Sequence, residues 1–275
     1  MTQAQLPVQI AARPTSWRTS ALVTGASGGI GLELARILAR EGHDLVLVAR
    51  SLPELEWLAA ELREQFGGTV EVIRSDLNEP AAVPQLFEAV AQRGVRIDLL
   101  INNAGFGLAG RFDQTDGRRE LEMIQVNVAA LTELTKLFLP GMITRGNGRI
   151  MNVASTAAFQ PGPLMAVYYA TKAYVLSFTQ AVAEEVRDTG VTLTALCPGP
   201  THTGFANVAN MQGTRLFNSP LTMGARAVAE YGYRAMMRGE RVAIPGVFNR
   251  LGAFATRLAP RRLLTKLARL AQENR

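Results

Sequence analysis

Residues 21–42, "ALVTGASGGIGLELARILAREG", decide the fold, because a short apolar run leads through a glycine-rich turn into an amphipathic stretch. The run "ALVTG" has the pattern of a buried strand. The stretch after the turn has the apolar spacing of a helix and ends at a glycine, which is typical of an α-helix. The apolar face of this helix holds Ile30, Leu34, Ile37 and Leu38. Residues 21–42 therefore predict a strand, a tight turn and a helix in direct succession.

The same alternation continues along the chain. Further strand patterns lie at 44–49, 69–76, 97–105, 148–155, 191–199 and 241–245. Helical patterns lie between them at 54–66, 80–94, 118–139, 165–187 and 224–238. Strict alternation predicts an α/β domain with a parallel sheet covered on both faces. Ligands bind beyond the carboxyl ends of the strands in such sheets, so functional residues are expected just after strands.

The turn at 24–31, "TGASGGIG", has the features of a phosphate-binding loop. Its glycines let the backbone approach an anion, and the helix that follows offers unpaired N–H groups and the positive end of a dipole. The same letters contain "GASGG", which fits the nucleophile elbow of hydrolases. His202 could serve as the base of such an enzyme, but only a loose arm precedes the elbow, so no earlier strand supplies oxyanion donors. We therefore favour the phosphate-binding interpretation.

A second glycine-rich stretch competes for the same role. Residues 105–110, "GFGLAG", match the GxGxxG pattern of dinucleotide-binding loops letter for letter. However, Asp116 and Gly117 delay the next helix, so no helix N-terminus follows Gly110 directly. The context favours 24–31 as the pyrophosphate loop and predicts that 105–110 is a loop above the sheet.

The end of the second strand pattern indicates which nicotinamide cofactor is preferred. A carboxylate at this point binds the ribose 2′-hydroxyl of NAD, whereas an arginine accommodates the 2′-phosphate of NADP. No Asp or Glu occupies positions 46–53, and Arg50 and Ser51 end the strand. The sequence therefore predicts NADP(H).

Catalytic chemistry is indicated by "YYATK" at 168–172. Tyr168 lies four residues before Lys172 and Tyr169 three, so either phenol can share a helix face with the ammonium. An ammonium beside a phenol favours the phenolate and lowers a pKa that is ordinarily near 10, which suits a general acid or base. Ser155, with Thr156 as its competitor, follows the fifth strand and could donate to a carbonyl oxygen.

Composition excludes several other classes of protein. The chain has 275 residues, of which 48% are hydrophobic and 19% charged, as expected of a compact enzyme-sized globule. A single cysteine, Cys197, excludes an intrachain disulfide framework, and with only His43 and His202 present no spacing suggests a metal site. This cysteine usage predicts a reducing, cytoplasmic setting.

The two ends differ in character from the body. Residues 1–17 contain no unbroken apolar core of the kind a signal peptide needs and are expected to form a flexible arm. From Arg241 onward the chain contains eight basic residues and one acidic residue, a net charge of +7, while the rest of the chain has a net charge of −1. The tail is short and has no interleaved aromatic residues, so nucleic-acid binding is not expected.

The stretch "RRLLTKLARLAQ" in the basic tail predicts an amphipathic helix. Its apolar side is expected to hold Leu263, Leu264, Leu267, Leu270 and Ala271, and its basic side Arg262, Lys266 and Arg269. A membrane surface, a partner subunit or packing on its own domain would suit this helix. Because the apolar face is short, we favour self-packing or a dimer contact.

Over roughly residues 18–246 the sequence resembles the short-chain dehydrogenase/reductase family, because six motifs occur in the order and spacing that are typical of that family. They are TGxxxGxG at 24–31, "NNAG" at 102–105, Asn127, Ser155, "YxxxK" at 168–172 and "PG" at 198–199. The resemblance implies a single-domain Rossmann-like fold, a doubly wound parallel sheet of about seven strands with helices on both faces, of the NADP-preferring branch. Residues 247–275 would then be a basic amphipathic extension, and the protein a homodimer or homotetramer.

The resemblance also implies roles for individual residues. By the family pattern Tyr168, not Tyr169, is the general acid, Ser155 and Lys172 complete the catalytic group, and Asn127 anchors a proton-relay water. Lys172 would also hold the nicotinamide ribose. The implied cofactor site comprises Gly25, Ser27, Gly29, Ile30 and Gly31 at the pyrophosphate; Arg50 and Ser51 at the 2′-phosphate; Asp76 and Leu77 at the adenine; Asn103, Ala104 and Gly105 at the adenosine side; and Pro198, Gly199, Thr201 and Thr203 at the nicotinamide end.

The expected reaction is hydride transfer between NADP(H) and a carbonyl or secondary alcohol. The substrate loop, near 200–223, contains Phe205, Val208, Met211, Leu216, Phe217 and Met223, with Arg215 as its charged residue. This composition predicts an apolar ketone, lipid-like or steroid-like. A 3-oxoacyl thioester reductase is the alternative enzyme, and a non-catalytic dinucleotide-binding sensor or scaffold is the alternative of another class.

Overall fold

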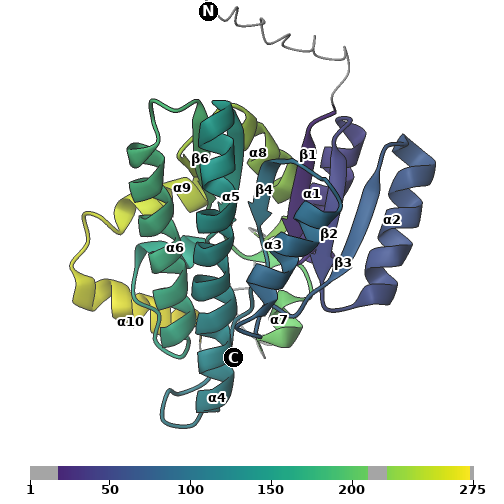
Figure 1. The fold of residues 1–275 in the computed structure, drawn as a ribbon. Coiled ribbons are helices and arrows are strands. Elements are labelled where there is room, and N and C mark those ends of the chain that lie inside the picture. The colour runs from purple at the N-terminus through teal and green to yellow at the C-terminus, as the bar shows by residue number, and fades with distance from the viewer. Residues whose placement is uncertain (1–17, 210–221, 273–275) are drawn as a thin grey trace, which may run out of the picture.

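The computed structural model describes residues 18–209 and 222–272. A seven-stranded parallel sheet runs in the order β3-β2-β1-β4-β5-β6-β9 (Figure 1). Its strands are β1 (Ser20–Thr24), β2 (Asp44–Ala49), β3 (Val70–Arg74), β4 (Ile97–Asn102), β5 (Gly148–Val153), β6 (Val191–Leu196) and β9 (Val242–Ala243). The order reverses beside β1, since β2 and β4 flank it, so the sheet is doubly wound as predicted.

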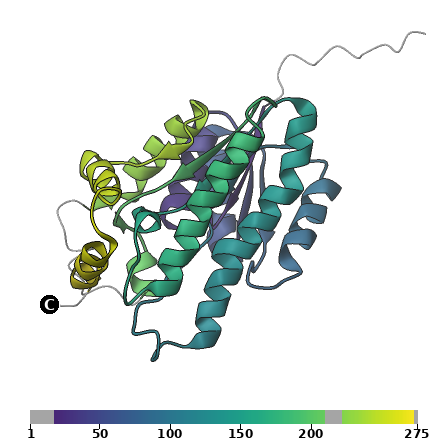
Figure 2. The ribbon, with the colours of Figure 1, turned by 90° about the vertical axis from the view of Figure 1, so that its left-hand side faces the viewer.

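Helices cover both faces of the sheet, as the views in Figures 1 and 2 show. They are α1 (Gly29–Arg40), α2 (Leu52–Phe66), α3 (Ala82–Gln92), α5 (Leu131–Arg145), α6 (Ala166–Glu185) and α8 (Ala225–Met237). Strand side chains alternate between the layers, which gives the sheet two cores. Ala21 and Val23 of β1 pack on the side of α1, α2 and α8, whereas Leu22 packs with α3 and α5.

The predicted helix at 118–139 is longer and less regular than expected. It runs through α4 (Gly117–Ile124), a π-helical segment (Gln125–Ala130) and α5, and it passes Pro140 to end at Arg145. By length and composition Gly117–Arg145 would suffice to cross a membrane, but its α5 part covers β4 and β5 of the sheet. The π turn holds Asn127, and such turns are frequent at functional sites.

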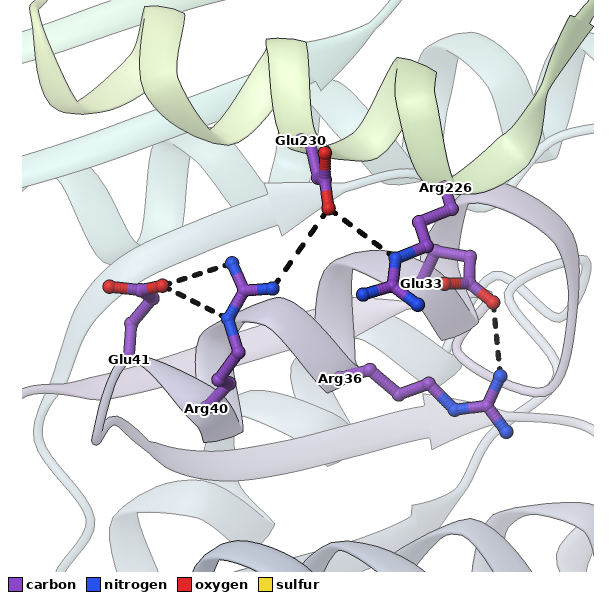
Figure 3. Close-up of polar contacts among 6 residues, drawn as sticks. All are labelled: Glu33, Arg36, Arg40, Glu41, Arg226 and Glu230. Atoms are coloured by element: carbon purple, nitrogen blue, oxygen red, sulfur yellow. Dashed lines mark hydrogen bonds and ion pairs between the residues drawn. The ribbon is translucent and has the colours of Figure 1, made fainter.

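A salt bridge joins α1 to α8, which pack on the same face of the sheet. Arg40 of α1 contacts Glu41 at 3.0 Å and Glu230 of α8 at 3.9 Å, and Arg226 reaches Glu230 at 3.4 Å (Figure 3). Surface pairs of this kind contribute at most about 1 kcal/mol each. The α1–α8 contact therefore depends mainly on the apolar core beneath it.

Several short elements were not predicted. Strands β7 (Thr201–His202) and β8 (Met223–Gly224) form a second, two-stranded sheet, and α7 (Phe205–Val208) follows β7. A short 3-10 helix occupies Thr156–Phe159, and α9 (Val247–Ala255) precedes the predicted tail helix α10 (Arg261–Gln272). The expected arm at 1–17, and Met211, Arg215, Leu216 and Phe217 of the substrate loop, lie outside the described residues.

Candidate active site

A cavity of about 1200 Å³ opens at the carboxyl ends of the strands, where the alternating pattern predicted a ligand. The residues expected at the cofactor that line it are Gly25, Ser27, Gly29, Ile30, Arg50, Ser51, Asp76, Leu77, Asn103, Ala104, Gly105, Tyr168, Lys172, Pro198, Gly199, Thr201 and Thr203. Ser155 lines it as well. Gly31 and Asn127 are buried in the wall behind it.

The loop after β1 has the shape of an anion cradle. Gly25 and Gly29 have φ of +66° and +57°, a region that favours glycine. A Cβ at Gly31 would lie 2.3 Å from the carbonyl oxygen of Gly25, so only glycine fits there. Asn103 fixes the loop by donating to the carbonyl oxygens of Thr24 (2.9 Å) and Gly25 (3.2 Å). These residues fit a dinucleotide pyrophosphate at the N-terminus of α1.

The competing stretch at 105–110 is a loop, because α4 begins only at Gly117. Its backbone is held from both sides. The N–H of Phe106 donates to Asn127 Oδ1 (3.1 Å), and a Cβ on Gly107 would meet the ring of Phe205 at 2.6 Å. Gly105 and Phe106 line the cavity. The structure thus confirms that no helix begins directly after residues 105–110, although they match the GxGxxG pattern letter for letter.

The far end of the cavity lies beside the ends of β2 and β3. Arg50 is exposed and lines the cavity together with Ser51 and Asp76. Ala49 pairs with Arg74 across the two strands, and Arg74 Nε donates to the carbonyl oxygen of Arg50 at 3.2 Å. The Arg74 side chain is thus held against the Arg50 backbone, and Arg50 brings a guanidinium to this end of the cavity, a group whose chemistry suits phosphate.

At the other end, Tyr168 is 9% exposed and lies with Ser155 and Lys172. Ser155 lies close enough to the phenol to affect its pKa, and Lys172 Nζ lies 5.8 Å from the centre of its ring. Burial raises the pKa of Tyr168, and the Ser155 side chain offsets this only in part. This differs from the lowered pKa expected from the sequence, because the phenol is desolvated by burial. The phenol therefore retains its proton and can act as an acid.

Lys172 is itself perturbed. Its ammonium is buried and donates to the carbonyl oxygen of Val153 at 2.8 Å. Burial lowers the pKa of Lys172 to about 8. Cys197 lies nearby, fully buried just after β6, and desolvation raises the pKa of its thiol to about 12. A thiol held protonated in this way is a poor nucleophile.

Tyr169, the alternative acid, has a different partner. Its hydroxyl accepts a hydrogen bond from Gln272 Nε2 of α10 at 2.8 Å, and its ring packs edge-on against Tyr168 with 6.1 Å between centres. Burial raises the pKa of Tyr169, offset in part by Gln272. Helical spacing left the two tyrosines equivalent, whereas the tertiary structure groups Tyr168 with Ser155 and Lys172.

Ser155 and Asn127 both have structural contacts besides their expected roles. Ser155 Oγ accepts from the N–H of Ala157 at 3.1 Å and thereby caps the 3-10 helix. Thr156 also lines the cavity. The Asn127 amide donates to the Phe106 carbonyl oxygen (3.0 Å) and to Thr171 Oγ1 (3.1 Å). The role of Asn127 as anchor of a relay water stays a prediction.

Sequence reasoning missed a set of residues on α9. The cavity is also lined by Phe248, Asn249, Gly252, Ala253 and Thr256. Asn249 Nδ2 donates to the carbonyl oxygen of Pro245 (2.8 Å), and a Cβ on Gly199 would lie 2.5 Å from Asn249 Oδ1. Residues from 248 to 256 therefore contribute to the wall of the cavity. The apolar spacing of "VFNRLGAFA" was the available signal for this helix.

Residues 19–213 match the sequence family described as short chain dehydrogenase. The chain belongs to the short-chain dehydrogenase/reductase family. The oxidoreductase UcpA of Escherichia coli K12 is 36% identical over 212 residues, which are 76% of this chain and 80% of that protein. The putative ketoacyl reductase of the monensin polyketide synthase from Streptomyces virginiae is 41% identical over 189 residues, 68% of this chain and 72% of that one.

A solved structure gives the same result. The short-chain dehydrogenase from Sphingobium yanoikuyae in complex with NADPH is 34% identical and superposes with a TM-score of 0.78, covering 87% of this chain and 94% of that one. The chain is thus an oxidoreductase that acts on an alcohol or carbonyl group with NAD(P)(H).

Proposed function

We propose that this enzyme transfers hydride between NADP(H) and the carbonyl or secondary alcohol of an apolar substrate. The observation that carries the cofactor preference is Arg50, exposed on the cavity at the end of β2 beside Ser51. No carboxylate occupies positions 46–53, and the 2′-phosphate of NADP would meet a guanidinium instead. The NADPH bound in the Sphingobium relative supports this choice.

The substrate end of the cavity supports an apolar carbonyl compound. Aromatic and aliphatic side chains line it, namely Phe106, Met165, Phe205, Val208 and Phe248. Its charged residues Arg119 and Glu122 form an ion pair of 2.7 Å, and the Arg119 guanidinium also lies 4.1 Å over the ring of Phe106. A ligand here meets apolar surface and an already neutralised pair.

The chain supplies the proton and the oxygen-binding groups. NADP(H), when bound, supplies or accepts the hydride. In reduction, Tyr168 would give its proton to the substrate oxygen while Ser155 donates a second hydrogen bond, and in oxidation Tyr168 would take the proton back. Since burial keeps the phenol protonated, the geometry is ready for reduction. Lys172, with its pKa near 8, would stabilise the phenolate left by proton transfer.

A 3-oxoacyl thioester reductase is the second candidate, supported by the similarity to the Streptomyces ketoacyl reductase. A non-catalytic dinucleotide sensor would keep the glycine loop but would have no use for Ser155, Tyr168 and Lys172 together. Substrate screening distinguishes these functions.

The test is NADPH oxidation against apolar ketones, aldehydes and 3-oxoacyl thioesters, run in parallel with NADH and with Tyr168→Phe as the inactive control. We expect turnover of apolar ketones with NADPH, and a large loss in the control. Preferential turnover of thioesters would select the second candidate. NADPH binding without turnover of any class would support the sensor, and better turnover with NADH would refute the cofactor assignment.

A further inference from the structure

The C-terminal helices present an unusual amount of apolar surface. Of the sixteen large apolar side chains that are exposed in the described residues, eight lie within 247–270. They are Val247, Phe248, Leu251, Phe254, Leu258, Leu263, Leu267 and Leu270, and we refer to them as the C-terminal patch. Both views show α9 and α10 at the outer edge of the molecule, away from the sheet (Figures 1 and 2). Exposed apolar surface of this density marks an interaction site.

The C-terminal patch points outward because the opposite faces of α9 and α10 are turned toward the rest of the protein. On α10, Leu264, Ala268 and Gln272 are buried, and Gln272 bonds to Tyr169. This differs from the single apolar side expected from the sequence, because self-packing uses Leu264 and leaves Leu263, Leu267 and Leu270 outward. On α9 the inward face lines the cavity, so Val247, Leu251 and Phe254 form a second outward stripe at helical spacing, and the exposed Leu258 lies in the turn that follows the helix.

Basic side chains accompany both stripes. Arg250 and Arg257 are exposed beside the α9 stripe, and Arg261, Arg262, Lys266 and Arg269 are exposed on α10. No Asp or Glu occurs anywhere between Val247 and Gln272. An apolar stripe bordered by cations alone is complementary to a surface with an apolar interior and anionic headgroups.

We propose that the C-terminal patch docks this enzyme onto an anionic lipid membrane. A second copy of the chain fits less well, because a two-fold contact would bring the same cationic segment against itself. A lipid surface meets both features at once, since the leucine and phenylalanine side chains insert below the headgroups while the arginines remain at their level.

The placement of the patch gives the docking a purpose. Phe248 is 68% exposed in the patch and also lines the cavity, so the patch borders the cavity mouth. A docked enzyme would therefore open its substrate end toward the bilayer, where an apolar ketone is concentrated. This step rests on the proposed function, whereas docking itself does not.

The test is co-sedimentation of the full chain with vesicles, without cofactor or substrate, so that it is independent of the proposed function. Vesicles of phosphatidylcholine alone are compared with vesicles that contain about one third phosphatidylglycerol, at low and at high salt. We expect binding to the anionic vesicles, weakened at least fivefold by high salt, and little binding to the neutral ones. Equal binding to both, or none, would overturn the proposal.

Matched variants locate the surface. Leu263→Ser with Leu267→Ser, and separately Arg262→Gln with Lys266→Gln, should each reduce vesicle binding at least fivefold. The controls, Leu121→Ser with Ile143→Ser, alter exposed apolar residues elsewhere and should bind as the parent protein does. Turnover of a small water-soluble ketone should be unchanged in all of them. Unaltered vesicle binding in the C-terminal variants would refute the location, and an oligomer that dissociates in them, with no vesicle binding in the parent, would show that a second copy covers the patch.

Discussion

The two ends of the cavity are built by different means. At the cofactor end, the loop after β1 offers backbone and space, and its fit depends on what Gly25, Gly29 and Gly31 lack. At the catalytic end, the site is formed by the buried side chains of Tyr168 and Lys172, whose pKa values are shifted by desolvation. Substitutions at the first end should therefore act through shape and charge on cofactor binding. Substitutions at the second should act on proton transfer.

The largest effect is expected from Tyr168→Phe, which removes only the proton-donating oxygen. Turnover should fall by about 10² to 10⁴ while NADPH affinity changes little, because the glycine loop lies at the other end. Steady-state kinetics and fluorescence titration of NADPH measure the two quantities separately. A fully active variant would remove Tyr168 from the mechanism and make Tyr169 the next residue to test.

Lys172 gives a prediction for stability as a function of pH. Its pKa is about 8 in the folded protein against an ordinary 10.5, so the unfolded chain binds more protons between these values. Stability should rise with pH across this window, by at most about 3 kcal/mol for this group. Burial raises the pKa of Cys197 and Tyr168, so these groups lower stability over the same window, but they are common to both chains. In urea unfolding at pH 7.5 and pH 10, the rise due to Lys172 should therefore appear as the difference between the parent protein and Lys172→Met.

The exposed Lys136 of α5 supplies the control. Lys136→Met should follow the parent protein at both pH values, because the other titrating groups are common to all three chains. If Lys172→Met and the parent protein show the same pH dependence, the buried ammonium is not desolvated as the structure indicates.

Arg50→Asp tests the cofactor end. A carboxylate would repel the 2′-phosphate and could accept from a ribose hydroxyl, so the preference for NADPH over NADH should fall by about 10- to 100-fold. The ratio of kcat/KM for the two cofactors measures this change. Arg93→Asp, an exposed arginine on the surface after α3, is the matched control and should leave the ratio unaltered. An unchanged ratio in Arg50→Asp would contradict the assignment to NADP(H).

Much of this architecture was predictable because its determinants are local. Apolar runs placed all seven strands of the main sheet within a few residues, and the glycine loop was recognised from the helix that follows it. The pairing of Thr201–His202 with Met223–Gly224, and the docking of α9 over the cavity, depend on contacts between distant segments that no local pattern encodes. The pKa of Tyr168 was expected in the wrong direction for the same reason, since burial is a property of the tertiary structure.

The sequence spacing also could not distinguish the adjacent Tyr168 and Tyr169, which differ only in their tertiary contacts. Of the substitutions predicted to have an effect, Tyr169→Phe should have the smallest. This change removes the acceptor for Gln272 Nε2 in a buried setting, so the free energy of unfolding should fall by about 1 kcal/mol. Turnover should change less than threefold, because the phenol of Tyr168 keeps Ser155 and Lys172. Tyr174 lies on α6, like Tyr169, and its exposed hydroxyl bonds to Thr132 of α5. Tyr174→Phe, which loses this hydrogen bond, should be nearly neutral in both measurements. A loss of turnover in Tyr169→Phe as large as that of Tyr168→Phe would mean that the hydroxyl held by α10, and not the one beside Lys172, carries the proton.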